Sequence, residues 1–349
     1  MQDKKLICCG NTDFSQTKEH YICVHCGKTY KKYKIIYQGN DLTEGNNCVS
    51  EQRYKGREIE KLKNNRIGLL YTNKYAVHSL EKDKLIPESV YEVSKSAVEV
   101  RKDENYLIEN TFREVLIVRN LNTNEIVKKR KCELIGLLNG YVLTLEERHR
   151  LCLYHLERCE HKILFDTYQL FGKDTIFQVH NVDISENRKR ASLFYVRIGQ
   201  KDTICGNIMI HLEDEIRYEN IIWEKLYNTV TYCYEQNQYY AVRDNKFVEV
   251  SVNGAEKKIL SAPQFTCILD GGITTPKIFQ NECQYAKIMR HNYCFIYDNS
   301  IVIIDSANYE PRFCYVNRTH DLIQSFEIID DEKLCFTAGN KAYIVTLGK

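Results

Sequence analysis

The stretch that decides the fold reads Arg66-Ile-Gly-Leu-Leu-Tyr-Thr-Asn and then Lys74-Tyr-Ala-Val-His, two short runs of β-forming residues around a tight turn. The same unit returns as Asn292-Tyr-Cys-Phe-Ile-Tyr-Asp-Asn with Ser300-Ile-Val-Ile-Ile-Asp. The chain contains seven such copies, and the first residue after the tight turn in each of them is Lys74, Phe112, His149, Ala191, Lys246, Ser300 or Lys341. Successive copies are 37 to 55 residues apart. A β-rich repeat of this length predicts an all-β array, a kind of architecture that usually binds other molecules.

Each full copy offers about four short segments rich in Val, Ile, Leu, Tyr and Phe. In one copy these are residues 133–138, 141–145, 150–154 and 162–166. Asn139-Gly140 separates the first two segments, and this dipeptide favours the positive φ angles of a type I′ hairpin turn. Asp244-Asn245 predicts another turn by the same chemistry. Residues 145–161 also fit an amphipathic helix, but the neighbouring copies favour strands.

Seven copies of four strands resemble a seven-bladed β-propeller over residues 35–349, so the expected fold class is all-β. The resemblance is architectural. No copy has the Gly-His and Trp-Asp pair of WD40 repeats, and no copy has the regularly placed diglycine of kelch repeats. A β-sandwich, or several small β domains, is the alternative fold.

Two intervals between copies are long enough to hold insertions, which we expect at residues 213–220 and 270–284. The last copy ends after its third strand, so a closed ring needs a fourth strand from the N-terminal part of the chain. Residues 34–37, or a segment between Cys48 and Gly56, are the two candidates. Closure of this kind removes exposed sheet edges.

A cysteine motif precedes the repeats. It reads Cys8-Cys9-Gly10 and, after twelve intervening residues, Cys23-Val-His-Cys26-Gly27, and it resembles a zinc ribbon. The resemblance implies a structural zinc bound by Cys8, Cys9, Cys23 and Cys26 in a module of residues 1–34. Its first half departs from the usual Cys-x-x-Cys spacing, so another residue can replace one ligand; the candidates are His20, His25 and Cys48. Free thiols, or a redox pair, are the alternatives to zinc.

The same module is basic, with seven lysines against three acidic residues within residues 1–34. Tyrosines interleave with the candidate nucleic-acid-binding lysines, which are Lys28, Lys31, Lys32 and Lys34. Such a surface can contact phosphates and stack on bases, but a solvated hairpin face has the same composition. Two further basic runs lie at residues 128–131 and 188–190.

Motifs of enzyme chemistry are absent. The chain has no Gly-x-Ser-x-Gly, no Gly-x-x-x-x-Gly-Lys loop and no His-Glu-x-x-His. A set of metal-ligand residue types lies close together in sequence, comprising His149, Cys152, His155, Cys159 and His161, but neither a helix nor a strand would bring four of them together. A propeller enzyme would instead collect carboxylates and histidines from several blades at its central channel.

The bulk composition narrows the cellular setting. The 349 residues carry a net charge of +2 and 15 cysteines, with no apolar N-terminal stretch of signal-peptide length and no run of about 20 apolar residues. We therefore expect a cytoplasmic protein. The favoured function is a non-catalytic scaffold or adaptor that docks a protein partner through the propeller faces and insertions. A nucleic-acid-binding subunit is the alternative, and a hydrolase with its site at the channel is the second alternative.

Overall fold

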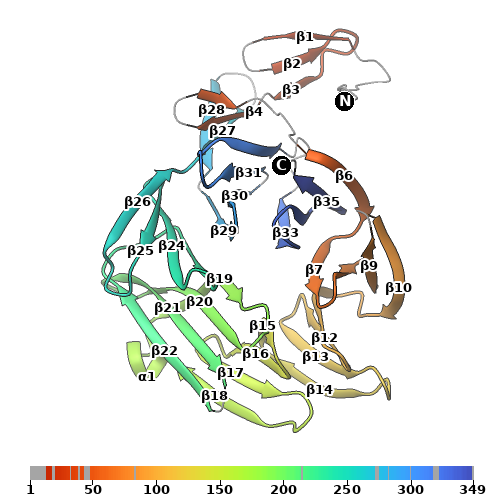
Figure 1. The fold of residues 1–349 in the computed structure, drawn as a ribbon, viewed down its shortest axis with the longest axis vertical. Coiled ribbons are helices and arrows are strands. Elements are labelled where there is room, and N and C mark those ends of the chain that lie inside the picture. Colours follow the sequence, from red (N-terminus) through yellow and green to blue (C-terminus); the bar gives the residue numbers. More distant parts are fainter. Residues whose placement is uncertain are drawn as a thin grey trace.

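The structure is a computed structural model that describes residues 13–17, 20–31, 33–37, 40–42, 48–81, 84–213, 215–271, 275–281, 283–298, 300–316 and 322–347. Seven four-stranded antiparallel sheets stand around a central axis as the blades of a ring (Figure 1). The first strand of each blade contacts the first strand of a neighbouring blade, so these strands line the centre. The predicted seven-bladed β-propeller is confirmed.

The strands of the first four blades follow one another along the chain. Blade 1 contains β7 (Glu58–Leu62), β8 (Arg66–Leu70), β9 (Lys74–Glu81) and β10 (Lys84–Glu92). Blade 2 contains β11 (Ala97–Lys102), β12 (Tyr106–Thr111), β13 (Val115–Asn120) and β14 (Ile126–Lys131). Blade 3 contains β15 (Glu133–Leu138), β16 (Tyr141–Glu146), β17 (Arg150–His155) and β18 (His161–Asp166). Blade 4 contains β19 (Ile176–Ile184), β20 (Arg190–Ile198), β21 (Thr203–Leu212) and β22 (Ile216–Trp223).

Blades 5 and 6 are again formed by consecutive segments, and blade 7 takes its fourth strand from the N-terminal part of the chain. Blade 5 contains β23 (Thr229–Cys233), β24 (Gln238–Arg243), β25 (Lys246–Val250) and β26 (Glu256–Ser261). Blade 6 contains β29 (Tyr285–Met289), β30 (Asn292–Ile296), β31 (Ser300–Asp305) and β32 (Pro311–Val316). Blade 7 contains β33 (Ile323–Ile328), β34 (Lys333–Ala338), β35 (Lys341–Leu347) and β6 (Cys48–Lys55).

The ring closes where β6 pairs with β35, from Cys48 opposite Leu347 to Lys55 opposite Lys341. Of the two predicted closing segments, the one between Cys48 and Gly56 is therefore correct. Residues 34–37 lie instead in β4 (Tyr33–Tyr37), outside the ring. The first and the last strands of the ring along the chain thus meet in blade 7, and the edge of β35 is covered by β6.

An eighth four-stranded sheet joins the N-terminal part to the predicted insertion between blades 5 and 6. The insertion forms β27 (Gln264–Gly271) and β28 (Thr275–Asn281), and β27 pairs with β4, which pairs with β5 (Asn40–Leu42). The insertion predicted at residues 213–220 is wrong, because that segment completes the hairpin of β21 and β22. Its interval is long because these strands have 10 and 8 residues.

N-terminal to β4, a small sheet consists of β1 (Phe14–Gln16), β2 (His20–Cys23) and β3 (Thr29–Lys31), in the order β1-β2-β3. It lies at one edge of the ring, beside β4 and β27 (Figure 1). The expected module boundary after residue 34 falls within β4. Within the described residues the α-helical content is α1 (Thr167–Phe171), and no helix there has the length and apolar character needed to cross a membrane.

The hydrophobic core is divided among the junctions between blades. In the described residues seven clusters of buried side chains each join two neighbouring blades. Phe247 of blade 5 packs edge-on against Phe295 of blade 6, with ring centroids 5.2 Å apart. Ile59 of blade 1 shares a cluster with Ile344 of blade 7, which completes the circle. Hydrophobic burial thus holds every blade to both of its neighbours.

Two predicted turns differ in geometry. Asp244 and Asn245 have φ angles of 49° and 57°, as a type I′ turn requires. At residues 139–140 only Gly140 has a positive φ, 73°, so the predicted type I′ turn is wrong there. Residues 145–161, the alternative helix, contain β17 and the ends of β16 and β18.

The antiparallel order sends successive turns to opposite faces of the ring. We call one face the α1 face: it carries the turns between second and third strands, and the connections between blades, which include α1. The other we call the Arg188 face: it carries the remaining turns, including the turn between β19 and β20 that holds Arg188. The two faces carry different chemistry.

Candidate functional site

The second half of the predicted zinc ribbon forms a hairpin. Cys23 ends β2, is 1% exposed, and its carbonyl accepts a hydrogen bond of 2.9 Å from the Gly27 amide. Gly27 has a φ of 68°, the left-handed conformation that lets the chain turn back after Cys26. Cys26 is exposed. The hairpin has the local shape of a zinc knuckle, and zinc binding remains a prediction.

The other predicted ligands and lysines are distributed as follows. Cys8, Cys9 and Lys32 lie outside the described residues. His25 is exposed, with its Nε2 3.5 Å from Asp13 Oδ2. His20 lies in β2 and Cys48 begins β6 of the ring. Lys28 is exposed in the hairpin, Lys31 ends β3, and Lys34 lies in β4.

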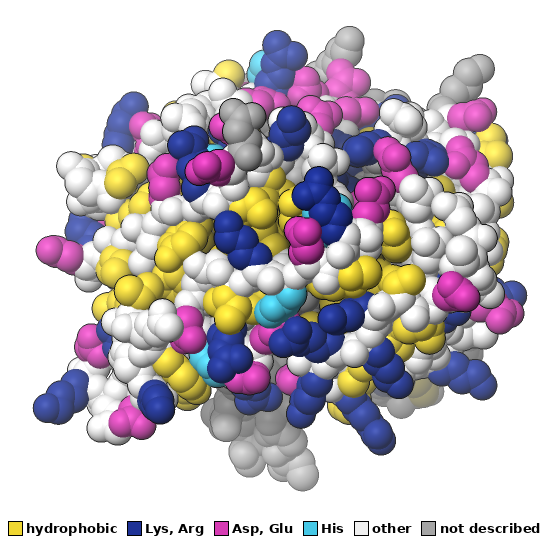
Figure 2. Space-filling model, turned by 90° about the horizontal axis from the view of Figure 1, so that it is seen from below, with side chains coloured by type: hydrophobic (Ala, Val, Ile, Leu, Met, Phe, Trp, Pro, Cys, Tyr) yellow, Lys and Arg dark blue, Asp and Glu magenta, His cyan; other side chains and the backbone are white. Residues whose placement is uncertain are grey.

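The two other basic runs do not extend the N-terminal lysines into one surface. β14, which holds residues 128–131, lies at the opposite edge of the ring from β3 (Figure 1). There Arg130 pairs with Glu146 at 2.6 Å, and Lys128 Nζ lies 4.9 Å from the ring centroid of Tyr154. Seen from that edge, several Lys and Arg side chains gather in the lower part of the view, among apolar ones and a few acidic ones (Figure 2). Lys129 and Lys131 are exposed, and this basic run is separate from the N-terminal lysines.

At the centre of the ring, carboxylates of β7 fasten the free edge of β11. Glu58 accepts a hydrogen bond of 3.0 Å from the Val100 amide, and Glu60 accepts one of 3.1 Å from the Lys102 amide. These amides point toward the channel, where an inner strand has no further strand to pair with. Arg101 pairs with Glu58 at 2.8 Å. The carboxylates therefore replace the missing strand and hold blade 1 to blade 2.

Asp183 performs the same task across blades 4, 5 and 6. Its Oδ2 accepts hydrogen bonds from the Tyr232 amide at 2.9 Å and the Thr231 hydroxyl at 3.0 Å, both on β23. Its Oδ1 accepts a charged hydrogen bond of 2.7 Å from Lys287 on β29. One buried carboxylate thus connects three inner strands, and charge-assisted bonds of this kind are stronger than neutral ones.

Arg188 crosses the channel from its turn in blade 4. Its guanidinium donates to the carbonyls of Lys61 and Lys102, each at 3.4 Å, and lies 3.6 Å from Glu60 Oε1. These partners belong to blades 1 and 2. Arg188 therefore bridges the channel near one face and connects blades that are not neighbours in the ring.

Burial shifts the titration of the channel acids. Burial raises the pKa of Glu58 to about 8, against the lowering effect of Arg101. Burial raises the pKa of Glu60 to about 7, again opposed by Arg101. It also raises the pKa of Glu327 on β33. Raised carboxyl pKa values occur in active sites and in buried ion-pair networks alike.

The channel has part of what the hydrolase hypothesis requires. Carboxylates converge from blades 1, 2, 4 and 7, and they are Glu58, Glu60, Glu99, Asp183 and Glu327. However, Glu58, Glu60 and Asp183 accept backbone amide hydrogen bonds and lie beside Arg or Lys. Carboxylates committed in this way stabilise the ring. The geometry of the described channel residues therefore favours a structural role.

The α1 face carries exposed apolar side chains. Phe112 is 82% exposed in the turn between β12 and β13, and Leu170 of α1 is 56% exposed. Ile176 and Ile198 are directly opposite each other on β19 and β20, and both are exposed. Outside the outermost strand of each blade, the large apolar side chains exposed on this face, among the described residues, are Val98, Phe112, Leu170, Ile176, Ile198, Leu226 and Leu322. Six of the seven lie on the arc from blade 2 to the connection between blades 4 and 5.

The Arg188 face differs. Outside the outermost strand of each blade, its large exposed apolar side chains among the described residues are Val252 and Tyr309. Ile126 and Val127 are also exposed, where the outermost strand β14 begins at this face. The turns there are polar, and ion pairs such as Lys63 with Glu104 at 3.7 Å and Arg290 with Asp331 at 3.4 Å lie across them. Sequence reasoning missed this asymmetry. One signal was available, since Phe112 is a large aromatic residue in an otherwise polar turn.

The predicted set of histidines and cysteines in blade 3 separates. His149 stacks on Tyr168, with ring centroids 3.9 Å apart, and Cys159 lies in a turn. Cys152 and His161 meet, and the third member of their group is Glu146. Sequence reasoning missed Glu146 because only His and Cys were considered.

Sequence comparison finds no matching family model and no matching curated protein. Among solved structures, Hsv2 of Kluyveromyces lactis superimposes with a TM-score of 0.52, at 8% identity, over 82% of this chain and 94% of that chain. The N-terminal domain of Nup159 gives a TM-score of 0.49 at 12% identity, over 84% of this chain and 90% of that chain. The computationally designed protein Ika8 gives 0.49 at 7% identity, over 86% and 98%. The similarity to Hsv2 supports the β-propeller fold and transfers no activity to this chain.

Proposed function

We propose that the protein is a non-catalytic scaffold that docks a protein partner on the α1 face. The observation that carries this proposal is the asymmetry of the ring: outside the outermost strand of each blade, seven large apolar side chains are exposed on the α1 face and two on the Arg188 face, among the described residues. Exposed apolar groups gathered on one side of a soluble protein commonly mark a protein contact.

Energetics support docking at this face. Burying one Phe or Ile side chain against a partner contributes about 1.5–3 kcal/mol. The backbone beneath them is held by four-stranded blades and by interblade cores, so little conformational entropy is lost on binding. A rigid platform with apolar anchors is what a scaffold needs.

We also propose that the N-terminal module binds a structural zinc ion through Cys23 and Cys26 together with Cys8 and Cys9. The Cys-x-x-Cys-Gly hairpin and the burial of Cys23 support this assignment. β4, which follows the module, pairs with β27 of the insertion and so attaches the module to the ring.

We place the protein in the cytoplasm. Support comes from thiols such as Cys294 and Cys335, which are buried in the blades with no disulfide and which pack as small apolar residues. Burial raises the pKa of both thiols, so they are poor nucleophiles.

The docking proposal predicts that Phe112→Asp with Ile176→Asp weakens partner binding at least about tenfold, a loss of about 1.4 kcal/mol or more. Val252→Asp is the matched control, because Val252 is 63% exposed on the other face. Proteins that co-purify with the wild type are identified, and the affinity of the purified partner for each variant is measured. Equal affinity for the wild type and the α1-face variant would contradict the proposal.

The zinc proposal predicts that Cys23→Ser lowers the zinc content by one ion per chain and leaves the ring folded. Metal analysis and far-ultraviolet circular dichroism measure the two effects. Lys28→Ser, in the same hairpin, is the control and should retain the ion. Unchanged zinc content in Cys23→Ser would refute the assignment.

A further inference from the structure

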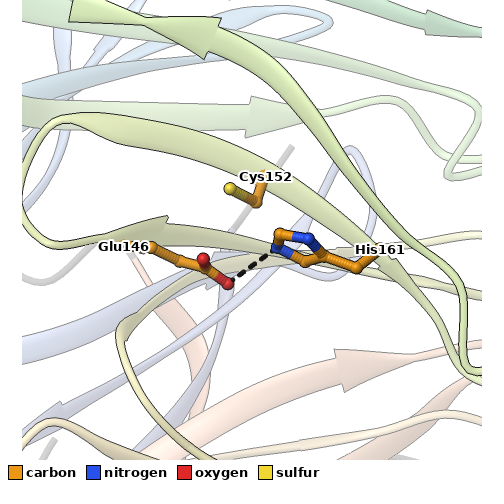
Figure 3. A group of neighbouring side chains, drawn as sticks. All are labelled: Glu146, Cys152 and His161. Carbon is orange, nitrogen blue, oxygen red and sulfur yellow. Dashed lines mark hydrogen bonds and ion pairs between the residues drawn. The ribbon is translucent and has the colours of Figure 1, made fainter. Parts of the chain in front are cut away.

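Glu146, Cys152 and His161 converge on one side of blade 3, at the opposite edge of the ring from β2, which ends at Cys23 (Figure 1). Glu146 ends β16, Cys152 lies in β17, and His161 begins β18. The Glu146 carboxylate and the His161 ring point toward each other, and the Cys152 sulfur lies beside them (Figure 3). The blade thus presents three different donor types from three adjacent strands.

The donor atoms are close enough to share one ion. All three ligand atoms lie within 4.8 Å of one another, and His161 Nε2 is 3.0 Å from Glu146 Oε1. Around tetrahedral zinc, bonds of about 2.0–2.3 Å separate ligand atoms by about 3.3–3.8 Å. Rotamer adjustments of about 1 Å would bring the three atoms to that spacing.

A cavity adjoins the cluster. It has a volume of about 10 Å³ and lies on the Glu146 and His161 side of the cluster, where Thr144, Lys128 and Arg130 also line it and Cys152 does not. The Thr144 hydroxyl is buried at this cavity, within hydrogen-bond reach of the Cys132 thiol. A space of this size holds about one water molecule. The space beside Glu146 and His161 therefore has room for a fourth ligand.

Two cations face the cluster from β14 of blade 2. Arg130 pairs with Glu146 Oε2 at 2.6 Å, and Lys128 lies over the Tyr154 ring. Arg130 occupies the carboxylate oxygen that does not face His161, so it can stay in place when the other oxygen binds an ion. A bond of this kind orients a ligating carboxylate.

Charge balance requires the thiolate form of Cys152. Cys152 is a buried cysteine with no disulfide, so the metal-free site holds a thiol. On binding, the sulfur forms a bond to the ion and its proton leaves to solvent. One dication with one carboxylate and one thiolate is then neutral, while Arg130 and Lys128 remain outside the ligand set.

We propose that Glu146, Cys152 and His161 form a zinc site with water as the fourth ligand. A sulfur and an imidazole nitrogen select zinc over magnesium and calcium, which prefer oxygen ligands. The ion would connect the three outer strands of blade 3 beside its junction with blade 2. This site is independent of the docking proposal and of the N-terminal zinc.

The test measures bound zinc on the full chain after chelator treatment and titration with zinc alone. His161→Gln and Cys152→Ser should each lower the stoichiometry by one ion per chain. His155→Gln is the matched control: His155 is a histidine of the same blade whose Nδ1 accepts the Arg158 amide at 3.1 Å. It should bind as much zinc as the wild type.

The contribution of the N-terminal site is removed by repeating the measurement in the Cys23→Ser variant. The zinc that remains bound to this variant should be lost in the double variant Cys23→Ser, His161→Gln. Excess zinc should raise the melting temperature of the Cys23→Ser protein and leave that of the Cys23→Ser, His161→Gln protein unchanged. Melting of the metal-free proteins shows whether each variant folds. Equal zinc content in wild type and His161→Gln, or an equal loss in His155→Gln, would overturn the proposal.

Discussion

The α1 face and the Arg188 face are built from the same strands, yet they use their side chains differently. Near the Arg188 face, Asp183 and Arg188 form hydrogen bonds that connect inner strands of several blades, so these side chains stabilise the fold. On the α1 face, the side chains of Phe112 and Ile176 are exposed to solvent and lie outside the buried clusters that join the blades. Side chains that contribute little to their own fold remain available for binding. The comparison therefore separates stability from recognition within one ring.

The largest difference between the two faces is expected for the free energy of unfolding, and Asp183→Ala tests it. This change leaves Lys287 buried without its partner, and the Tyr232 amide without an acceptor, so the free energy of unfolding should fall by about 3–5 kcal/mol. Urea unfolding followed by circular dichroism measures it. Phe112→Ala, on the α1 face, should change the free energy of unfolding by no more than about 0.5 kcal/mol. Comparable losses in both variants would show that the faces do not differ in this way.

The second prediction uses pH. Glu58 and Glu60 have folded pKa values of about 8 and about 7, above the value of about 4.3 for an unfolded chain. The folded state then binds more protons than the unfolded state between about pH 4.5 and 8, so their contribution to stability falls as pH rises through that window. Glu58→Gln should reduce the loss of stability between pH 6 and pH 8.5 by on the order of 1–3 kcal/mol.

Urea unfolding at the two pH values measures this difference. Glu104→Gln is the control, because its side chain is 78% exposed at the Arg188 face. If Glu58→Gln and Glu104→Gln have the same pH dependence as the wild type, Glu58 does not titrate in this range. The Glu58 carboxylate would then lie in a more polar environment than its burial indicates.

Sequence periodicity was sufficient to predict the blades, because each blade repeats local strand and turn chemistry. It also limited the closing strand to two candidate segments, and the one between Cys48 and Gly56 closes the ring. Length alone misled at residues 213–220, where longer strands and an inserted loop give the same interval. Local patterns therefore determine the elements more reliably than they determine where additional residues are placed.

The channel was beyond sequence reasoning for a physical reason. Arg188 and Lys61 are 127 residues apart, and charged residues on strands read as solvated until the ring brings them together. Two of the three residues of the blade 3 cluster could be identified as candidate ligands from the sequence. Cys152 and His161 have ligand chemistry, but Glu146 resembles any acidic residue before a turn until β16, β17 and β18 pair.

The smallest expected effect is the most informative about recognition. Phe112→Ser and Val252→Ser each replace an exposed apolar side chain in a turn, one on each face, and each should change the free energy of unfolding by less than about 0.5 kcal/mol. Their effects on partner affinity should nevertheless differ, because only Phe112 belongs to the apolar arc. Denaturation curves and binding isotherms for the two variants test both statements. A loss of affinity in Val252→Ser that equals the loss in Phe112→Ser would place binding on both faces, and stability measurements alone would not reveal it.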